Sequence, residues 1–143
     1  MERLFVYSDG GARGNPGPAA IGIVILDENN HKIAEHKEYL GIKTNNQAEY
    51  LAIITALEIV SKYSKKVHFY SDSELMIKQL LGEYKIRNPV LQSLFKIVEE
   101  KEKSLEEVSY AHVRRENEFI QEADKLVNEA LDEEKKKRNN KLQ

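Results

Sequence analysis

The order of strand-like and helix-like segments limits this chain to few folds. Three short segments rich in β-branched and aromatic residues come first, and helical periodicity then alternates with further strands. The predicted strands cover residues 4–9, 20–26, 32–40, 67–71 and 107–113, and the predicted helices cover about 45–63, 72–81, 89–98 and 119–131. The order βββαβααβα predicts an α/β fold in which a five-stranded mixed sheet is flanked by helices.

Turn signals indicate how the first strands connect. Residues 10–18 hold four of the seven glycines and two of the three prolines, which predicts a loop. Only Asp27–Asn30 separates the second and third strands, so these two should form an antiparallel hairpin. In mixed sheets, functional groups collect at the carboxyl ends of the parallel strands. Asp9 and Asp72 each end a predicted strand and should share one edge of the sheet.

Capping patterns predict where the helices begin. Thr44 and Gln47 have the spacing of a capping box before the helix at 45–63. Ser71 and Glu74 have the same spacing and predict a second box, with Gly82 near the end of that helix. Asn88-Pro89 indicates the start of the next helix.

Length and composition predict one globular domain. The chain has 143 residues, of which 41% are hydrophobic and 32% charged, and a formal net charge of −2. No apolar run approaches a membrane span, no signal pattern opens the chain, and there is no cysteine, so a cytoplasmic monomer is expected. Residues 1–131 are expected to form this domain, and residues 132–143 a frayed polar tail.

Four carboxylates lie near the ends of predicted strands and helices, namely Asp9, Glu49, Asp72 and Asp124. Taken alone, each has an ordinary explanation as a turn residue, a helix-start acid or a solvated helical residue. Gathered together, unpaired acids would repel one another, which favours a bound cation. Magnesium and manganese prefer such oxygen ligands, and two ions about 4 Å apart would suit phosphoryl displacement.

The segments around these acids resemble the motifs of type I ribonucleases H, in the same order. They are Tyr7-Ser-Asp-Gly-Gly-Ala-Arg-Gly-Asn-Pro-Gly-Pro18, Thr44-Asn-Asn-Gln-Ala-Glu49, Tyr70-Ser-Asp-Ser73 and Glu122-Ala-Asp-Lys-Leu-Val-Asn-Glu-Ala130. The resemblance covers about residues 4–131. It implies an endoribonuclease that cuts the RNA strand of RNA/DNA hybrids with Mg²⁺ or Mn²⁺, leaving a 5′-phosphate and a 3′-hydroxyl. It also implies that the four acids are the metal ligands.

Neutral polar residues beside the acids suit this substrate. They are Asn15, Asn45, Asn46 and Gln47, which can donate and accept hydrogen bonds to 2′-hydroxyls and base edges in a shallow minor groove. Thr44, at a helix start, is a candidate to hold a phosphate of the DNA strand. Double-stranded RNA is a second candidate substrate.

Two departures from the family pattern stand out. Many relatives carry a histidine in the loop before the last helix, where this chain has Arg114-Arg-Glu-Asn-Glu-Phe119. Arg114 or Arg115 could substitute electrostatically, but arginine cannot act as a base. Some relatives also insert a basic, Trp-bearing handle between the middle helices, and this chain has no Trp. The histidines at 31, 36, 68 and 112 are expected to be structural or solvated.

Three other interpretations remain open from the residues. One is a nuclease of the same fold that cuts or joins DNA, such as a transposase or Holliday-junction nuclease, which the asparagine-rich segments disfavour. Another is a non-catalytic hybrid- or RNA-binding module, which the intact set of four acids disfavours. The last is a domain that uses a metal only for stability.

Overall fold

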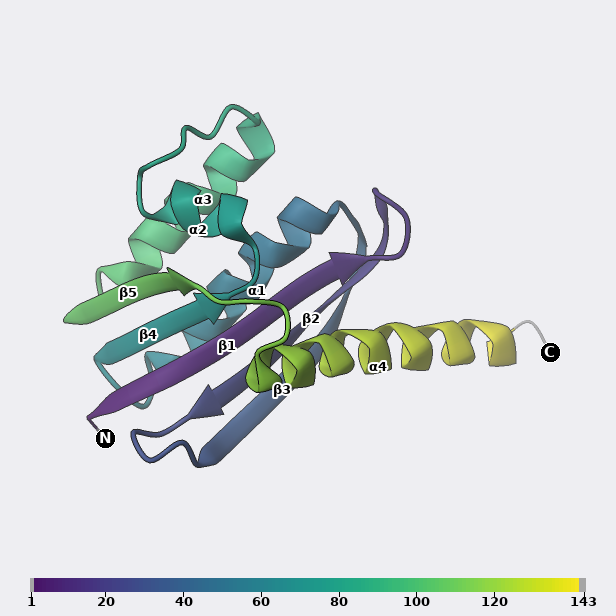
Figure 1. The fold of residues 1–143 in the computed structure, drawn as a ribbon. Coiled ribbons are helices and arrows are strands. Elements are labelled where there is room, and N and C mark those ends of the chain that lie inside the picture. The colour runs from purple at the N-terminus through teal and green to yellow at the C-terminus, as the bar shows by residue number, and fades with distance from the viewer. Residues whose placement is uncertain (1, 142–143) are drawn as a thin grey trace.

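A five-stranded mixed sheet forms the centre of the computed structural model, which describes residues 2–141 (Figure 1). The elements are β1 (Arg3–Ala12), β2 (Gly17–Leu26), β3 (Lys32–Lys43), α1 (Asn45–Val60), β4 (Lys66–Ser71), α2 (Glu74–Leu80), α3 (Pro89–Glu102), β5 (Glu107–His112) and α4 (Glu118–Lys141). The strand order is β3-β2-β1-β4-β5, with β1, β4 and β5 parallel and β2 antiparallel to both neighbours. The predicted element order and the predicted hairpin are confirmed.

Helices cover the two faces of the sheet unequally. Alternate residues of β1 point to opposite faces. Leu4 and Val6 join the main core, which α1 fills with residues such as Ile53 and Leu57 and to which α2 and α3 contribute. On the opposite face, Tyr7 packs with residues of α4, the helix that crosses this face of the sheet in Figure 1. The described residues include no helix long and apolar enough to span a membrane.

Two glycines allow helices to lie directly against the sheet. A Cβ on Gly10 would come within 2.4 Å of the Ala48 carbonyl carbon on α1. A Cβ on Gly22 would come within 2.1 Å of the Ala123 carbonyl oxygen on α4. Because real Cβ atoms do not approach backbone atoms this closely, any larger residue would push the helix away. These contacts therefore set the distances of α1 and α4 from the two central strands.

Some predicted boundaries are wrong. The loop predicted at 10–18 is much shorter, because β1 and β2 remain paired out to Ala12 and Ala19 and the Arg13 N–H donates to the Pro18 carbonyl at 2.8 Å. The second capping box is also wrong. Ser73 is the N-cap of α2 and accepts from the Met76 N–H, while Ser71 still belongs to β4. The capping box at Thr44 and the helix start at Asn88 are confirmed.

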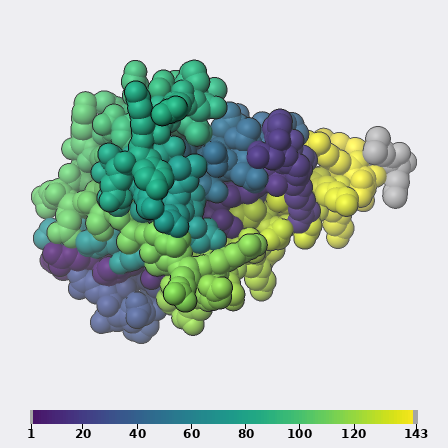
Figure 2. All heavy atoms as spheres, turned by 45° about the horizontal axis from the view of Figure 1, so that its top comes forward, coloured from purple at the N-terminus to yellow at the C-terminus, as the bar shows by residue number. Residues whose placement is uncertain are grey.

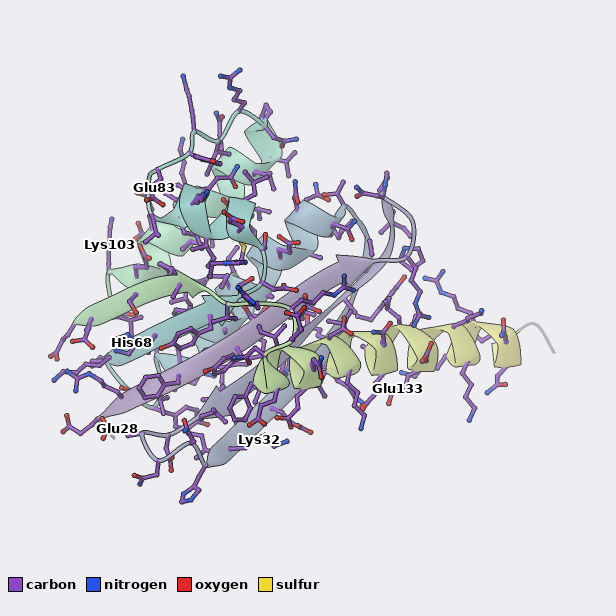
Figure 3. All side chains as sticks on the ribbon, in the orientation of Figure 1. Glu28, Lys32, His68, Glu83, Lys103 and Glu133 are labelled. Carbon is purple, nitrogen blue, oxygen red and sulfur yellow. The ribbon has the colours of Figure 1, made fainter. Side chains whose placement is uncertain are left out.

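The frayed tail predicted at 132–143 is wrong for residues 132–141, which continue α4, while residues 142–143 lie outside the described part. No glycine or proline interrupts this stretch. Side-chain contacts also hold it to the sheet, since Asp132 pairs with Arg13 at 2.8 Å and Glu133 with Lys37 at 2.8 Å. Figure 3 labels Glu133 on this part of the helix.

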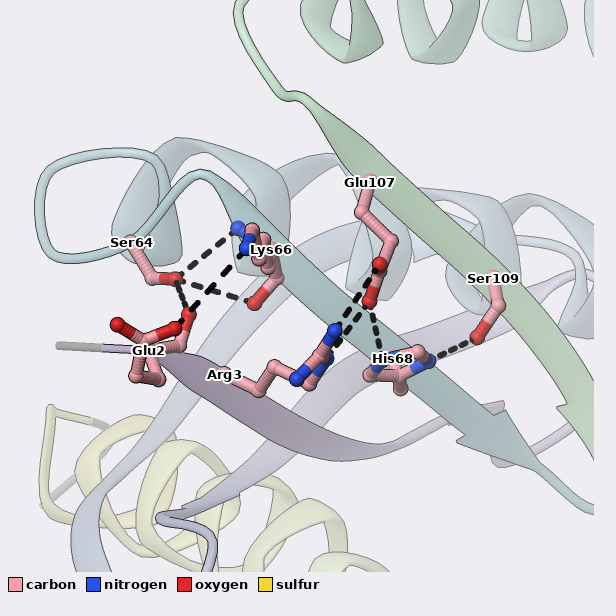
Figure 4. A network of polar contacts seen from close by, with 7 residues as sticks. All are labelled: Glu2, Arg3, Ser64, Lys66, His68, Glu107 and Ser109. Carbon is pink, nitrogen blue, oxygen red and sulfur yellow. Dashed lines mark hydrogen bonds and ion pairs between the residues drawn. The ribbon is translucent and has the colours of Figure 1, made fainter.

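The polar contacts of His68 (Figure 4) lie in the amino-terminal half of the parallel strands, whereas Asp9 and Asp72 lie toward their carboxyl ends. Its Nε2 lies 2.8 Å from Glu107 Oε2 on β5, and its Nδ1 contacts the Ser109 hydroxyl. Arg3 of β1 donates to the same Glu107 carboxylate at 2.9 Å. This network ties β1, β4 and β5 together, which agrees with the structural role expected for His68.

The substitution Gly22→Ala tests the contact between α4 and β2. The added methyl group would collide with the Ala123 carbonyl, so we expect a loss of about 2–3 kcal/mol in the free energy of unfolding, as for overpacked sites. Urea denaturation followed by circular dichroism measures the loss. Gly11→Ala is the matched control, because its Cβ would meet no atom closer than 3.9 Å. Equal unfolding midpoints for the two variants would contradict this account.

Candidate active site

A cleft of about 730 Å³ opens where the parallel strands β1 and β4 end. All four predicted acids line it, so the structure brings together Asp9, Glu49, Asp72 and Asp124. The polar and charged residues beside them include Arg13, Asn45, Arg115, Gln121 and Asn128.

Each acid reaches the cleft from a different element. Asp9 lies within the central strand β1, directly opposite Gly22 of β2. Asp72 directly follows β4, and the parallel pairing of β1 and β4 puts it at the same edge. Glu49 lies on α1 and Asp124 on α4, one residue after the carbonyls of Ala48 and Ala123 that the two glycines contact. The close packing of α1 and α4 on the two glycines therefore also positions Glu49 and Asp124 at the cleft.

Burial and mutual repulsion shift the titration of two of these acids. The pKa of Asp9 is raised to about 8, chiefly because the carboxyl group is buried, and further by the charges of Asp72 and Asp124 and a hydrogen bond with Asp124. The pKa of Glu49 is raised to about 7 by burial, although a hydrogen bond with Ser73 acts in the opposite direction. Negative charge at the base of the cleft is therefore unfavourable without a positive partner.

The four carboxylates share the cleft without forming a finished metal site. Within residues 2–141, no three His, Cys, Asp or Glu side chains stand in a geometry ready to hold a metal ion. Side-chain rotation alone can reorient carboxylates that lie on rigid elements.

Asn45 is the predicted substrate residue that lines the cleft. Its Oδ1 accepts from the Ala12 N–H at 2.8 Å, which turns its Nδ2 donor away from that backbone. Asn15 supports it, since the Asn15 Oδ1 accepts from the Asn45 N–H at 3.0 Å. Thr44 and Gln47 are engaged in the capping box of α1, and Asn46 is exposed on its first turn.

Two cleft residues were not predicted from the sequence. Arg13 pairs with Asp132 at 2.8 Å and donates to Asn128 Oδ1 at 3.1 Å. Asn128 in turn donates to the Asp124 backbone carbonyl at 3.0 Å and reaches the Asp124 carboxylate at 3.5 Å. The spacing of Asn128 four residues after Asp124 was a usable signal, because such residues share a helix face. No sequence signal pointed to Arg13, because its partners Asn128 and Asp132 lie more than 100 residues away in the chain.

Arg115, one of the two arginines expected to replace the family histidine electrostatically, does line the cleft. It lies in the turn between β5 and α4. A permanently charged guanidinium there lowers the electrostatic cost of bringing a polyanion to an acidic cleft.

Comparisons with known proteins agree with this geometry. The family model described as "Reverse transcriptase-like" matches residues 7–130. The crystal structure of ribonuclease H1 from Halobacterium salinarum is 38% identical with a TM-score of 0.87, covering 92% of this chain and 98% of that one. LC11-RNase H1, solved in complex with an RNA/DNA hybrid, is 39% identical with a TM-score of 0.85, covering 91% and 97%.

The curated relatives are longer proteins. The chain is 39% identical to ribonuclease HI of Halobacterium salinarum over 92% of its own length but spans 65% of that protein. It is 33% identical to a bifunctional protein of Mycobacterium tuberculosis, of which it spans 36%. The shared fold and the family match over residues 7–130 lead to one conclusion: the chain belongs to the reverse-transcriptase-like family of ribonuclease H domains.

Proposed function

We propose that the chain is a metal-dependent endoribonuclease that hydrolyses the RNA strand of RNA/DNA hybrids and leaves 5′-phosphate and 3′-hydroxyl ends. The observation that carries the proposal is the gathering of Asp9, Glu49, Asp72 and Asp124, from four separate elements, in one cleft. The named relatives and the hybrid bound to LC11-RNase H1 support it. Since a single chain supplies all four acids, the proposed active unit is a monomer.

The donor set fits divalent cations. Hard Mg²⁺ and Mn²⁺ ions prefer carboxylate oxygens, and the raised pKa values of Asp9 and Glu49 indicate a site where bound positive charge would be favourable. The four acids would hold two such ions. The chemistry that these ions supply when bound is activation of a water molecule and neutralisation of charge on the leaving 3′-oxygen.

The polar residues of the cleft would position the substrate. Asn45, whose orientation the Ala12 N–H determines, directs its Nδ2 donor away from β1 and toward a substrate acceptor such as a 2′-hydroxyl. Asn15 would keep Asn45 in place. The Thr44 hydroxyl accepts from the Gln47 N–H, which leaves its O–H free to donate to a phosphate. Because the cut strand presents the same A-form 2′-hydroxyls in double-stranded RNA, the proposal extends to that substrate.

The first test is cleavage of a labelled hybrid with Mg²⁺ or Mn²⁺. We expect cutting of the RNA strand alone, abolished by EDTA and lowered on the order of 100-fold or more by Asp9→Asn. Asp27→Asn is the matched control, because Asp27 lies in the β2–β3 turn away from the cleft and Asn can still accept its turn hydrogen bonds. If the protein bound the hybrid but did not cut it with either metal, the chain would be a binding module and not an enzyme.

The same Asp9→Asn variant should be more stable than the wild type in EDTA at pH 8. In the unfolded chain Asp9 titrates near pH ~4, whereas in the folded chain its pKa is raised to about 8. The folded state therefore retains a proton between these values, so stability falls as pH rises. The expected gain is about 1–3 kcal/mol at pH 8, vanishing near pH 4.

Urea denaturation at both pH values measures this gain, and MgCl₂ should then stabilise the wild type more than the variant. An identical stability difference at pH 4 and pH 8 would show that burial and repulsion at Asp9 are not its cause.

The variant Asn45→Asp tests the substrate role of Asn45. A carboxylate oxygen can still accept from the Ala12 N–H, but it adds negative charge to an acidic cleft, so a stability loss of about 1 kcal/mol or less is expected without metal. The Nδ2 donor is lost and a negative charge is added, so KM for the hybrid should rise roughly tenfold. Asn29→Asp, in the exposed β2–β3 turn, makes the same charge change far from the cleft. Equal KM values for both variants would show that Asn45 does not contribute to substrate binding.

A further inference from the structure

We infer that the C-terminal end of α4, residues 131–141, is a phosphate-binding arm that holds the duplex backbone outside the catalytic cleft. This inference rests on the proposed function and names how the substrate is held. The arm extends past the edge of the sheet in Figure 1, and Figure 2 shows its yellow end beside the purple turn between β1 and β2.

The last residues of the arm are strongly basic, while the rest of the chain is acidic. Residues 135–141 carry five Lys and Arg and no Asp or Glu. With the three acids at residues 132–134, the whole arm carries a net charge of +2, which leaves −4 on the rest of a chain of net charge −2. A polyanion approaching an acidic cleft on an acidic body needs positive charge nearby, because phosphate neutralisation dominates duplex affinity.

Helical geometry aligns the arm with the catalytic acid. Residues spaced by three or four lie on one face of a helix. Asp124, Asn128, Leu131, Lys135 and Arg138 follow this spacing on α4, and the first three line the catalytic cleft. Lys135 and Arg138 line a second groove of about 350 Å³, which shares Arg13 and Leu131 with the cleft. The two hollows are therefore neighbours along α4, with Arg13 and Leu131 lining both.

The second groove has the composition of a site for backbone phosphate. Three cations line it, namely Arg13, Lys135 and Arg138, beside Tyr39 and one acid, Glu134. Arg138 donates to the Tyr39 hydroxyl at 2.9 Å and pairs with Glu134 at 3.3 Å. Asp132 pairs with Arg13.

Lys135 is the cation of this groove that remains free for a ligand. It is exposed and makes no ion pair within residues 2–141. Arg13 and Arg138, each with an acidic partner, shape the groove on either side of it.

The position of Lys135 along α4 predicts how far from the cut site it contacts the duplex. Lys135 lies eleven residues after Asp124, which is about 16 Å along a helix that rises 1.5 Å per residue. For a duplex that runs parallel to α4, this distance corresponds to about five base pairs at roughly 3.4 Å each. The arm should therefore contact the duplex about five base pairs from the cut site.

The test compares Lys135→Gln with Lys137→Gln. Both remove one charge from the arm, but Lys137 lies two residues further on and faces a different side of α4. Steady-state cleavage and fluorescence anisotropy are measured with a long hybrid and with one that ends about three base pairs from the cut site, over a range of salt concentrations.

We expect Lys135→Gln to raise KM and Kd three- to tenfold on the long hybrid without changing kcat. The slope of log affinity against log salt should become shallower by about 0.9. The effect should disappear on the short hybrid, and Lys137→Gln, whose side chain does not line the groove, should change KM and Kd by less than half as much. Equal effects of the two variants, or no effect of Lys135→Gln, would contradict the inference that this groove of the arm binds phosphate. Wild-type protein that binds but never cuts would overturn the proposed function instead, while the anisotropy comparison would still test the arm.

Discussion

The approach of two helices to bare glycine backbone is the contact on which the rest of this structure depends. Gly10 allows α1 to lie against β1, and Gly22 allows α4 to lie against β2 from the other face. The residues next to these contacts on the helices are Glu49 and Asp124. The packing that completes the core on both faces therefore also places two acids beside the part of β1 that carries Asp9.

As an electrostatic consequence, ionisation of two of the acids at the base of the cleft is unfavourable. Burial and neighbouring acids raise the pKa of Asp9 to about 8, and burial raises the pKa of Glu49 to about 7. Such strain persists only where the surrounding scaffold is rigid enough to hold it, and here the acids stand on packed strands and helices. A bound cation would relieve the repulsion, so the same feature that costs stability would favour the divalent metal of the proposed function.

The distribution of charge suggests how an acidic protein could bind nucleic acid. Negative charge is concentrated on the body and in the cleft, while positive charge is concentrated on the end of α4. Arg13 connects the two regions, because it contacts both Asp132 on the arm and Asn128 beside the catalytic acid. A chain without the basic, Trp-bearing handle of some relatives could thus obtain its phosphate contacts from a helix that simply continues beyond the sheet.

Local patterns in the sequence determined the element order, the hairpin, the capping box at Thr44 and the identity of the four acids, because periodicity, turn chemistry and motif spacing act over a few residues. Strand ends, the Ser73 cap and the helical state of residues 132–141 depended on partners distant in the chain, such as Ala19 for Ala12 and Arg13 for Asp132. The roles of Arg13 and Gly22 likewise appeared only when β1, β2 and α4 were packed together. Contacts between segments about 100 residues apart leave no local signature, so only the tertiary structure decided them.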